Sequence, residues 1–300
     1  MRAYVVSRLA QTALVVFLSL TAVFAMVRLS GDPVLLFMPM DIQAKDVNEF
    51  CQRLGFNDPV PVQYARFLAG AVRGDFGDSL RYRQDAMGLV LERLPATLLL
   101  AGTSLLLTFA VAVPLGVLSA VRRGFRRALA LGRADAHRRR AASFPFILLA
   151  MTINAIVALG LRNIILSLSA AGWVVYARVV RGEVLSVKQR DYVQAAAALG
   201  MSRARLVVRH VLPNAAPSII VVASLQFSSF IVAEAAISFL GFGIQPPTPA
   251  WGSMLSESRD FVYVAWWLAA FPGAALALTA LGVNLLGDWL RDTMDPKLRV

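Results

Sequence analysis

The chain has 300 residues, of which 58% are hydrophobic and only 16% are charged, and its mean hydropathy is +0.63. This composition is too apolar for an ordinary soluble protein and indicates a membrane protein with several spans. A net charge of +12 would suit nucleic-acid binding, but in a membrane protein an arginine excess usually marks cytoplasmic loops, so we expect no nucleic-acid partner. Cys51 is the single cysteine, which excludes an intrachain disulfide and a cysteine metal cluster.

The first apolar run covers residues 9–27 and follows Arg2 and Arg8, so it predicts a first transmembrane helix. A cleaved signal peptide is the alternative interpretation, but the run exceeds a typical signal core and no A-x-A site follows it. Residues 31–95 are polar and rich in turn-forming Gly, Asp and Pro. We expect this stretch to be a loop outside the membrane.

A second span is predicted over residues 96–121, with Pro114 tolerated as a kink. The loop after it, residues 122–143, carries eight arginines. This is the strongest positive-inside signal in the chain, and it assigns the loop to the cytoplasm. A patch for lipid headgroups or RNA is the alternative use of these arginines, but the topology already accounts for them.

Four more spans are predicted, over residues 144–159, 164–180, 218–240 and 262–286. The third and fourth spans form a tight hairpin that turns at residues 160–163. Six crossings put both termini in the cytoplasm, and every arginine-rich loop then falls on the same side. The predicted fold class is therefore an all-α membrane protein with about six transmembrane helices.

Polar residues inside the spans need a reason, because burying an ionisable group in lipid is costly. Glu234 must face another helix, pair with a cation or line an aqueous path, and both packing and substrate contact stay open. Interhelical hydrogen bonds are the simpler role for Asn154, Gln226 and Asn284. Candidates for the translocation path or for helix packing are thus Gln226, Glu234 and Asn284. The proline-rich stretch 245–252 is expected to be a non-helical outer loop with Trp251 at the membrane interface.

One polar, patterned segment, residues 190–213, interrupts the apolar spans, and we interpret it as a cytoplasmic docking element. Four of its residues recur at helical spacing: Tyr192, Val193, Ala196 and Leu199. The alanines at 195–198 would let another protein approach this helix closely. Gly200 is expected to end the helix.

A second short helix is predicted after Ser202, which can cap it, and Pro213 is expected to close it. One of its faces carries Leu206, Val207 and His210. The other carries Arg203, Arg205 and Arg209, which meet water or phosphate. Two short helices at an angle make a protruding knob, although an ordinary cytoplasmic connector is the alternative.

The motif Gln194-Ala195-Ala196, then Gly200, then Leu212-Pro213 resembles the EAA loop of the membrane subunits (permeases) of bacterial ABC importers. In that family the short helix of the loop sits in a groove of an ATPase subunit. Gln194 stands where the loop's name expects Glu, and His210 stands where an aliphatic is usual. The resemblance implies a coupling role for Tyr192, Gln194, Ala195, Ala196, Gly200, Arg203, Arg209, His210 and Pro213.

The resemblance comes in two pieces, both of the peptide and nickel importer class. GDPV from Gly31 and GDFGDSL from Gly74 resemble the first permease of the pair, whereas AEAAISFLGFGIQPPTPAWGSML from Ala233 resembles the second. We infer a join of two neighbouring subunits. It divides the chain into an N-terminal membrane part, a seam and a permease core with the 190–213 loop, at residues 1–121, 122–143 and 144–300.

The resemblance implies a type I ABC importer permease that moves peptides or nickel across the bacterial cytoplasmic (inner) membrane. Its implied partners are two ATP-binding-cassette ATPase subunits, a second permease and an extracytoplasmic substrate-binding protein. No G-x-x-x-x-G-K-[ST] loop occurs, so we expect ATP hydrolysis to come from a partner. We expect no cofactor, metal or catalytic residue.

Two other functions stay open. A fused or degraded permease could act only as an inert membrane scaffold. An intramembrane enzyme is poorly supplied with residues, because His137 and His210 both lie in predicted cytoplasmic loops and no HExxH motif occurs.

Overall fold

The computed structural model describes most positions of residues 10–26, residue 52 and residues 57–73, 79, 84–121, 145–157, 160–244, 250–262 and 267–294. The predicted seam over residues 122–143 lies outside the described residues. The same holds for both extreme termini and for residues 245–249 of the predicted outer loop.

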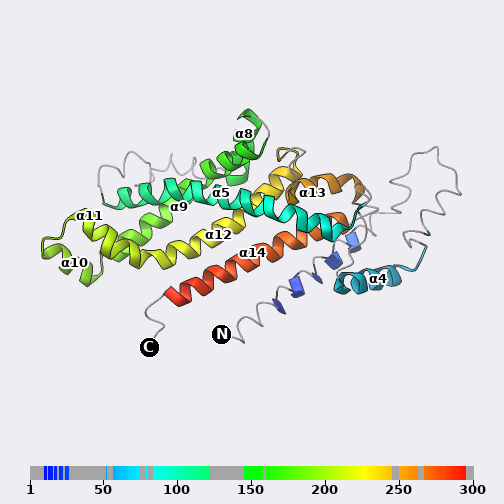
Figure 1. The fold of residues 1–300 in the computed structure, drawn as a ribbon, viewed down its shortest axis with the longest axis horizontal. Coiled ribbons are helices and arrows are strands. Elements are labelled where there is room, and N and C mark those ends of the chain that lie inside the picture. The colour runs from blue at the N-terminus through cyan, green and yellow to red at the C-terminus, as the bar shows by residue number, and fades with distance from the viewer. Residues whose placement is uncertain are drawn as a thin grey trace. The chain divides into compact units, whose positions relative to one another are not determined.

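The described elements are helices, which confirms the predicted all-α class (Figure 1). They are α4 (Val60–Arg73), α5 (Ala86–Val121), α8 (Phe146–Val157), α9 (Leu161–Lys188), α10 (Asp191–Ala198), α11 (Arg203–Leu206), the π-helix η2 (Val207–Val211), α12 (Leu212–Phe239), α13 (Trp251–Ser258), the 3₁₀-helix η3 (Arg259–Phe261) and α14 (Trp267–Met294). No β-strand is assigned in this part of the chain.

Four helices are long and apolar enough to cross a membrane: Ala86–Val121, Leu161–Lys188, Arg203–Phe239 and Trp267–Arg291. They correspond to the predicted second, fourth, fifth and sixth spans. The predicted first and third spans correspond to shorter apolar helices, Ala13–Met26 and Phe146–Val157. The hairpin between the third and fourth spans turns at Gly160, whose φ of +148° favours glycine.

The prediction that residues 31–95 are only loop is wrong at two places. α4 forms within this stretch, and α5 begins at Ala86, ten residues before the predicted span. Asp85 explains the early start, because its side chain accepts a hydrogen bond from the backbone N–H of Gly88 at 2.7 Å and so caps α5. Pro95 lies inside α5, where it removes one hydrogen bond of a long helix without ending it.

The chain divides into two compact units, and α5, α12 and α14 contribute residues to both. The first unit contains residues 1–97, 238–241 and 246–278. Within it, aromatic side chains of α4 pack on the N-terminal helix and on the start of α14. The ring centroids of Phe24 and Tyr64 are 5.0 Å apart, and those of Phe67 and Phe271 are 5.7 Å apart.

Two predictions about Trp251 are wrong. Residues 245–252 are predicted to be a non-helical outer loop, and Trp251 is predicted to lie at the membrane interface. α13 begins at Trp251, because Ser253 caps the new helix through Ala250. Trp251 is buried in the first unit. Its indole N–H donates to the carbonyl of Val90 at 2.8 Å, which satisfies the polar edge of the ring inside the protein.

The second unit contains residues 98–237, 242–245 and 279–300. α5 and α9 approach closely in it at Gly116, where a side chain would come within 2.9 Å of the carbonyl of Ala177. The hydroxyl of Tyr176 donates to the carbonyl of Ile219 at 2.7 Å and so ties α9 to α12. Asn154 of α8 donates to the carbonyl of Phe242, beyond the end of α12.

The prediction that Pro213 closes a separate second helix is wrong. α11, the π-helix and α12 run on without a break, so Pro213 lies inside the fifth span. A wider π turn precedes Pro213. In it, the N–H of Leu212 donates to the carbonyl of Val207, five residues back, and the helix continues through the proline. The side chain of Asn214 also donates to the carbonyl of His210 at 2.8 Å, which satisfies a backbone group near the proline.

Candidate functional site

The 190–213 segment begins with a well-defined start of α10. Arg190 is extended, with φ −71° and ψ 143°, and its carbonyl accepts from the N–H groups of Val193 and Gln194 at 3.0 and 3.2 Å. Asp191 lies in the first turn, where a negative charge favours the helix N-terminus. The predicted helix therefore forms with a local start signal of its own.

Gly200 ends α10 as predicted. Its φ is +83°, and its N–H donates to the carbonyl of Ala197 at 3.1 Å, while the N–H of Met201 donates to Ala196 at 3.2 Å. This pair of bonds is the Schellman motif, which requires a left-handed residue where Gly200 stands. The chain thus turns sharply between α10 and α11.

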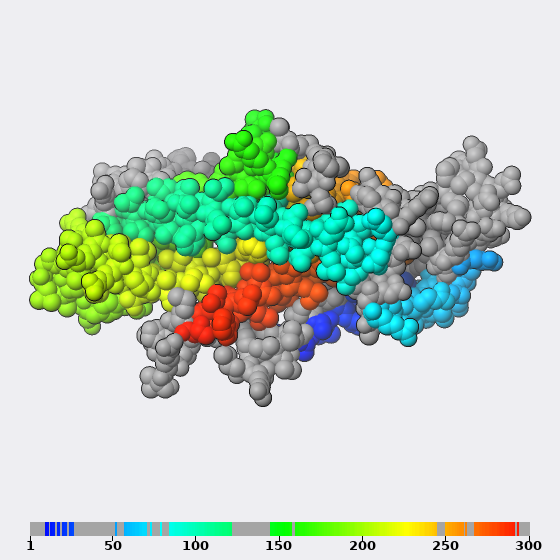
Figure 2. All heavy atoms as spheres, viewed as in Figure 1, coloured from blue at the N-terminus to red at the C-terminus, as the bar shows by residue number. Residues whose placement is uncertain are grey.

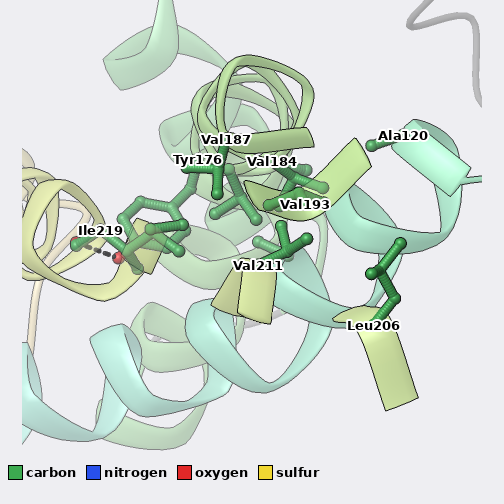
Figure 3. Packing of buried hydrophobic residues seen from close by; sticks show 12 residues of the cluster. Ala120, Tyr176, Val184, Val187, Val193, Leu206, Val211 and Ile219 are labelled. Atoms are coloured by element: carbon green, nitrogen blue, oxygen red, sulfur yellow. Dashed lines mark hydrogen bonds between the residues drawn. The ribbon is translucent and has the colours of Figure 1, made fainter. Parts of the chain in front are cut away.

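The inner side of the 190–213 segment is anchored in the core of the second unit (Figure 3). Val193 from α10 and Leu206 from α11 are buried, and they share a cluster with Val184 and Val187 of α9. Val211 and Ile219 belong to the same cluster. Because protein interiors are close-packed, this cluster joins the segment, the end of α9 and the start of α12 into one body.

The outer side of the segment carries exposed apolar and basic side chains. Leu199 is 90% exposed, Val208 is 66% exposed and Tyr192 is 42% exposed. The arginines around them are all exposed: Arg190, Arg203, Arg205 and Arg209. On the face in view, Figure 2 shows the yellow-green atoms of this segment in the open.

The predicted apolar face of α10 splits in two. Val193 and Ala196 face the core, but Tyr192 lies to the side and Leu199 stands in the turn after the helix. The faces predicted for the next helix are confirmed. Leu206 and Val207 are buried with His210 half-buried beside them, whereas the arginines there face outward.

Gln194 is exposed, but its amide also makes one bond within the chain. Its Nε2 donates to the carbonyl of Gln189 at the end of α9, at 3.1 Å. Ala195 is exposed, whereas Ala196 packs against the core cluster. Pro213 is exposed within α12. The segment is therefore present with the expected residues, but only some of them are available to a partner.

The polar residues of the spans lie inside the second unit. Asn284 of α14 accepts a hydrogen bond from Ser228 of α12 at 2.9 Å, which confirms an interhelical bond. Asn154 instead donates to the main-chain carbonyl of Phe242, which lies after the end of α12, so its bond joins a helix to the following turn rather than two helices. Gln226 lies beside Gly172, and its predicted hydrogen bond stays a prediction. Glu234 is completely buried, so it does not face lipid.

Sequence reasoning did not identify three structural features of the second unit. Leu199 was noticed only as part of a helical pattern, and its exposure follows from the turn at Gly200. The exposure of Val208 could not be predicted, because an apolar residue next to a transmembrane run resembles the run itself. Tyr176 lies in an apolar run, and its hydroxyl partner 43 residues away is a tertiary contact.

Comparison with known proteins places these features in a family. Residues 112–300 match the family described as binding-protein-dependent transport system inner membrane component, and residues 1–101 match the N-terminal part of such membrane components. The chain belongs to this family of transport components. The predicted recognition as an importer permease is thereby confirmed.

Relatives within the family include permease proteins of peptide transport systems. The di/tripeptide transport system permease protein DppC of Pseudomonas aeruginosa is 44% identical over 157 residues, which is 52% of each chain. The dipeptide transport system permease protein DppC of Alkalihalophilus pseudofirmus is 43% identical over 157 residues, again 52% of each chain. The glutathione transport system permease protein GsiD of Escherichia coli is 41% identical with the same coverage. The chain therefore spans about half the length of the curated relatives it matches.

A solved structure has a similar fold. It is described as inward facing conformations of the MetNI methionine ABC transporter, and it is 21% identical with a TM-score of 0.56. The match covers 70% of this chain and 97% of that one. This likeness confirms the predicted importer-permease fold.

Proposed function

We propose that the chain is a permease subunit of an ATP-driven importer that carries peptides across the bacterial cytoplasmic membrane. Family membership over residues 112–300 and the peptide-transport names of the relatives support this role. Nickel is the alternative substrate from the sequence resemblance. The family consists of transport components rather than enzymes, and we propose no catalytic role for the chain.

The observation that carries the proposal is the 190–213 segment, which is exposed on one side and anchored on the other. An ATPase subunit that binds Leu199 and its neighbours would move this segment. The end of α9 and the start of α12 share a core cluster with the segment and would move with it. Close packing at Val184, Val193 and Val211 would transmit that movement from the segment to α9 and α12. The two spans would then tilt together and switch the path between its outward-facing and inward-facing states.

The proposed partners follow from this mechanism. Two ATP-binding-cassette subunits would hold the 190–213 segments of this chain and of a second permease, and a substrate-binding protein would deliver the peptide from outside. The segment and both termini would then lie in the cytoplasm, as the arginine-rich loops favour. Gln226, Glu234 and Asn284 would serve helix packing, and contact of Glu234 with substrate remains its alternative role.

A second candidate is that the chain joins parts of two permeases and acts as an inert scaffold. The observation that favours it is that the relatives named above match only 157 residues, about half of this chain. We propose the boundaries 1–121, 122–143 and 144–300 for such a join. Sequencing across residues 122–143 and the mass of the purified chain test whether the join is genuine.

Two substitutions test the proposed function in proteoliposomes that contain the chain, a second permease, the ATPase subunits and a loaded binding protein. Ala196→Asp puts a carboxylate into the core cluster, and Gly200→Pro is incompatible with a φ of +83°. Both should separate ATP hydrolysis from peptide uptake. Ala65→Asp makes the same change as Ala196→Asp at an exposed position of α4 in the first unit, so it is the matched control and should leave coupling intact. Normal coupling in both test variants would refute the proposal, and a wild-type chain that never stimulates the ATPase would favour the inert scaffold.

A further inference from the structure

The 190–213 segment offers a partner exposed side chains beyond those of the EAA motif itself. The amide of Gln194 is engaged with the carbonyl of Gln189, and Ala196 packs inward. Of the three motif residues, Ala196 is therefore packed against the chain's own core, Gln194 is exposed with one amide N–H engaged, and Ala195 offers only a methyl group. The side chain that stands out is Leu199, at 90% exposure.

Leu199 is held in place although it is exposed. Its N–H donates to the carbonyl of Ala195 at 3.0 Å, and the next residue, Gly200, completes the turn with its bond to Ala197. Met201 then packs against the core cluster, so the turn is fixed on both sides. The main chain at Leu199 is therefore pre-organised, which lowers the entropy cost of presenting this side chain to a recess.

The surroundings of Leu199 are basic. The 190–213 segment contains four arginines and one aspartate, which gives it a net charge of +3 with His210 neutral. All four arginine side chains are exposed. A partner surface that complements them carries carboxylates around an apolar centre.

We propose that Leu199 is the anchor by which this segment binds its ATPase, in an apolar socket with an acidic rim. The inference rests on the proposed function and deepens it, because it names the contact residue and the chemistry of the partner surface. Gln194 is then a positioning residue that fixes the corner between α9 and α10. The arginines raise the rate of association with the ATPase, and Leu199 slows dissociation of the complex.

The test is a binding titration of the labelled ATPase subunit against the full chain, reconstituted with the second permease in nanodiscs. Leu199→Ala should weaken binding about tenfold or more, as expected for truncation of an interface anchor. Leu199→Met keeps an apolar side chain of similar volume and should stay within about threefold of the wild type. Leu225→Ala, at an exposed position of α12 well outside the segment, is the matched control and should change nothing.

The salt dependence of binding separates the contribution of the arginines from that of Leu199. Binding should weaken as the NaCl concentration rises, and Arg205→Gln should flatten this dependence, because exposed charges are screened. Unchanged affinity in Leu199→Ala, while the wild type binds and stimulates hydrolysis, would overturn the anchor and leave the proposed function standing. Binding insensitive to salt and to Arg205→Gln would overturn the acidic rim. A wild-type chain that binds no ATPase at all would instead refute the proposed function itself.

Discussion

The side-chain amide of Gln194 donates a hydrogen bond to the main-chain carbonyl of Gln189, with 3.1 Å between nitrogen and oxygen. Gln189 ends α9 and Gln194 lies in the first turns of α10, so the bond spans the corner between the two helices. A glutamate, which the EAA pattern expects here, has no donor when it is ionised. Gln194, which departs from the EAA pattern, therefore makes a bond between α9 and α10 that an ionised glutamate could not make.

Gln194→Glu should loosen this corner. The carboxylate would face the carbonyl end of α9, where negative charge is unfavourable, and the hydrogen bond would be lost. We expect a loss of about 1 kcal/mol or less in stability and less peptide uptake per ATP hydrolysed. Gln189→Ala is the matched control, because the bond uses only the main chain of that residue. Equal coupling in Gln194→Glu and wild type would show that the corner is held without this bond.

Gly200→Ala should destabilise the turn between α10 and α11. A side chain at a φ of +83° costs about 1–2 kcal/mol, and nothing else crowds the position. Gly200→Asn should cost less, since asparagine tolerates this conformation. Gly182→Ala, at an open position inside α9, should be neutral or stabilising, and thermal unfolding in detergent compares the three variants. Similar melting temperatures for Gly200→Ala and Gly182→Ala would contradict the assigned turn.

Gly287→Ala tests how closely α12 and α14 pack. A Cβ at this position would overlap the side chain of Ser224, whereas one at Gly282 on the same helix would meet nothing. We expect Gly287→Ala to cost about 1–3 kcal/mol and Gly282→Ala to be harmless. The double variant with Ser224→Gly should recover part of the loss, because it removes the overlapping atoms. A loss that is the same with and without Ser224→Gly would mean that the contact is not the cause.

The membrane class and the order of the spans were predictable, because the thickness of a bilayer imposes long apolar runs whatever surrounds them. The end of α10 was predictable for a local reason, since the positive φ at Gly200 suits glycine. The start of α5 was missed although Asp85 carried the signal. Its capping bond to Gly88 needs only three residues of sequence, but the polar composition of the stretch suggested a loop.

Other features depend on tertiary contacts and could not be predicted locally. Trp251 is buried because it meets Val90 and Thr97 of α5, more than 150 residues earlier. Pro213 does not end its helix, because a π turn with buried Val207 and Val211 precedes it, and no local pattern in the sequence indicates this turn. The direction of Gln194 likewise depends on where α9 ends.

Tyr176→Phe should weaken the tie between α9 and α12. The hydroxyl of Tyr176 is buried, and its loss leaves the carbonyl of Ile219 without that donor. We expect a loss of about 1 kcal/mol in the free energy of unfolding. Tyr192→Phe makes the same chemical change at an exposed position and should have almost no effect on stability. If the two variants unfold alike, the hydrogen bond contributes nothing.

The ion pair between Arg93 of α5 and Glu257 of α13 gives the sharpest test of the first unit. Its nitrogen and oxygen lie 3.5 Å apart, and both side chains are largely shielded from solvent. Glu257→Gln removes one charge and leaves the arginine buried, so we expect a loss of about 3 kcal/mol. The exposed pair of Arg66 and Asp58 is the matched control in the same unit, with 2.6 Å between its charged atoms. Because water screens that pair, Asp58→Asn should cost less than about 1 kcal/mol despite the shorter distance. Chemical denaturation of the purified chain measures both losses, and a smaller loss for Glu257→Gln than for Asp58→Asn would show that burial does not govern the strength of the pair.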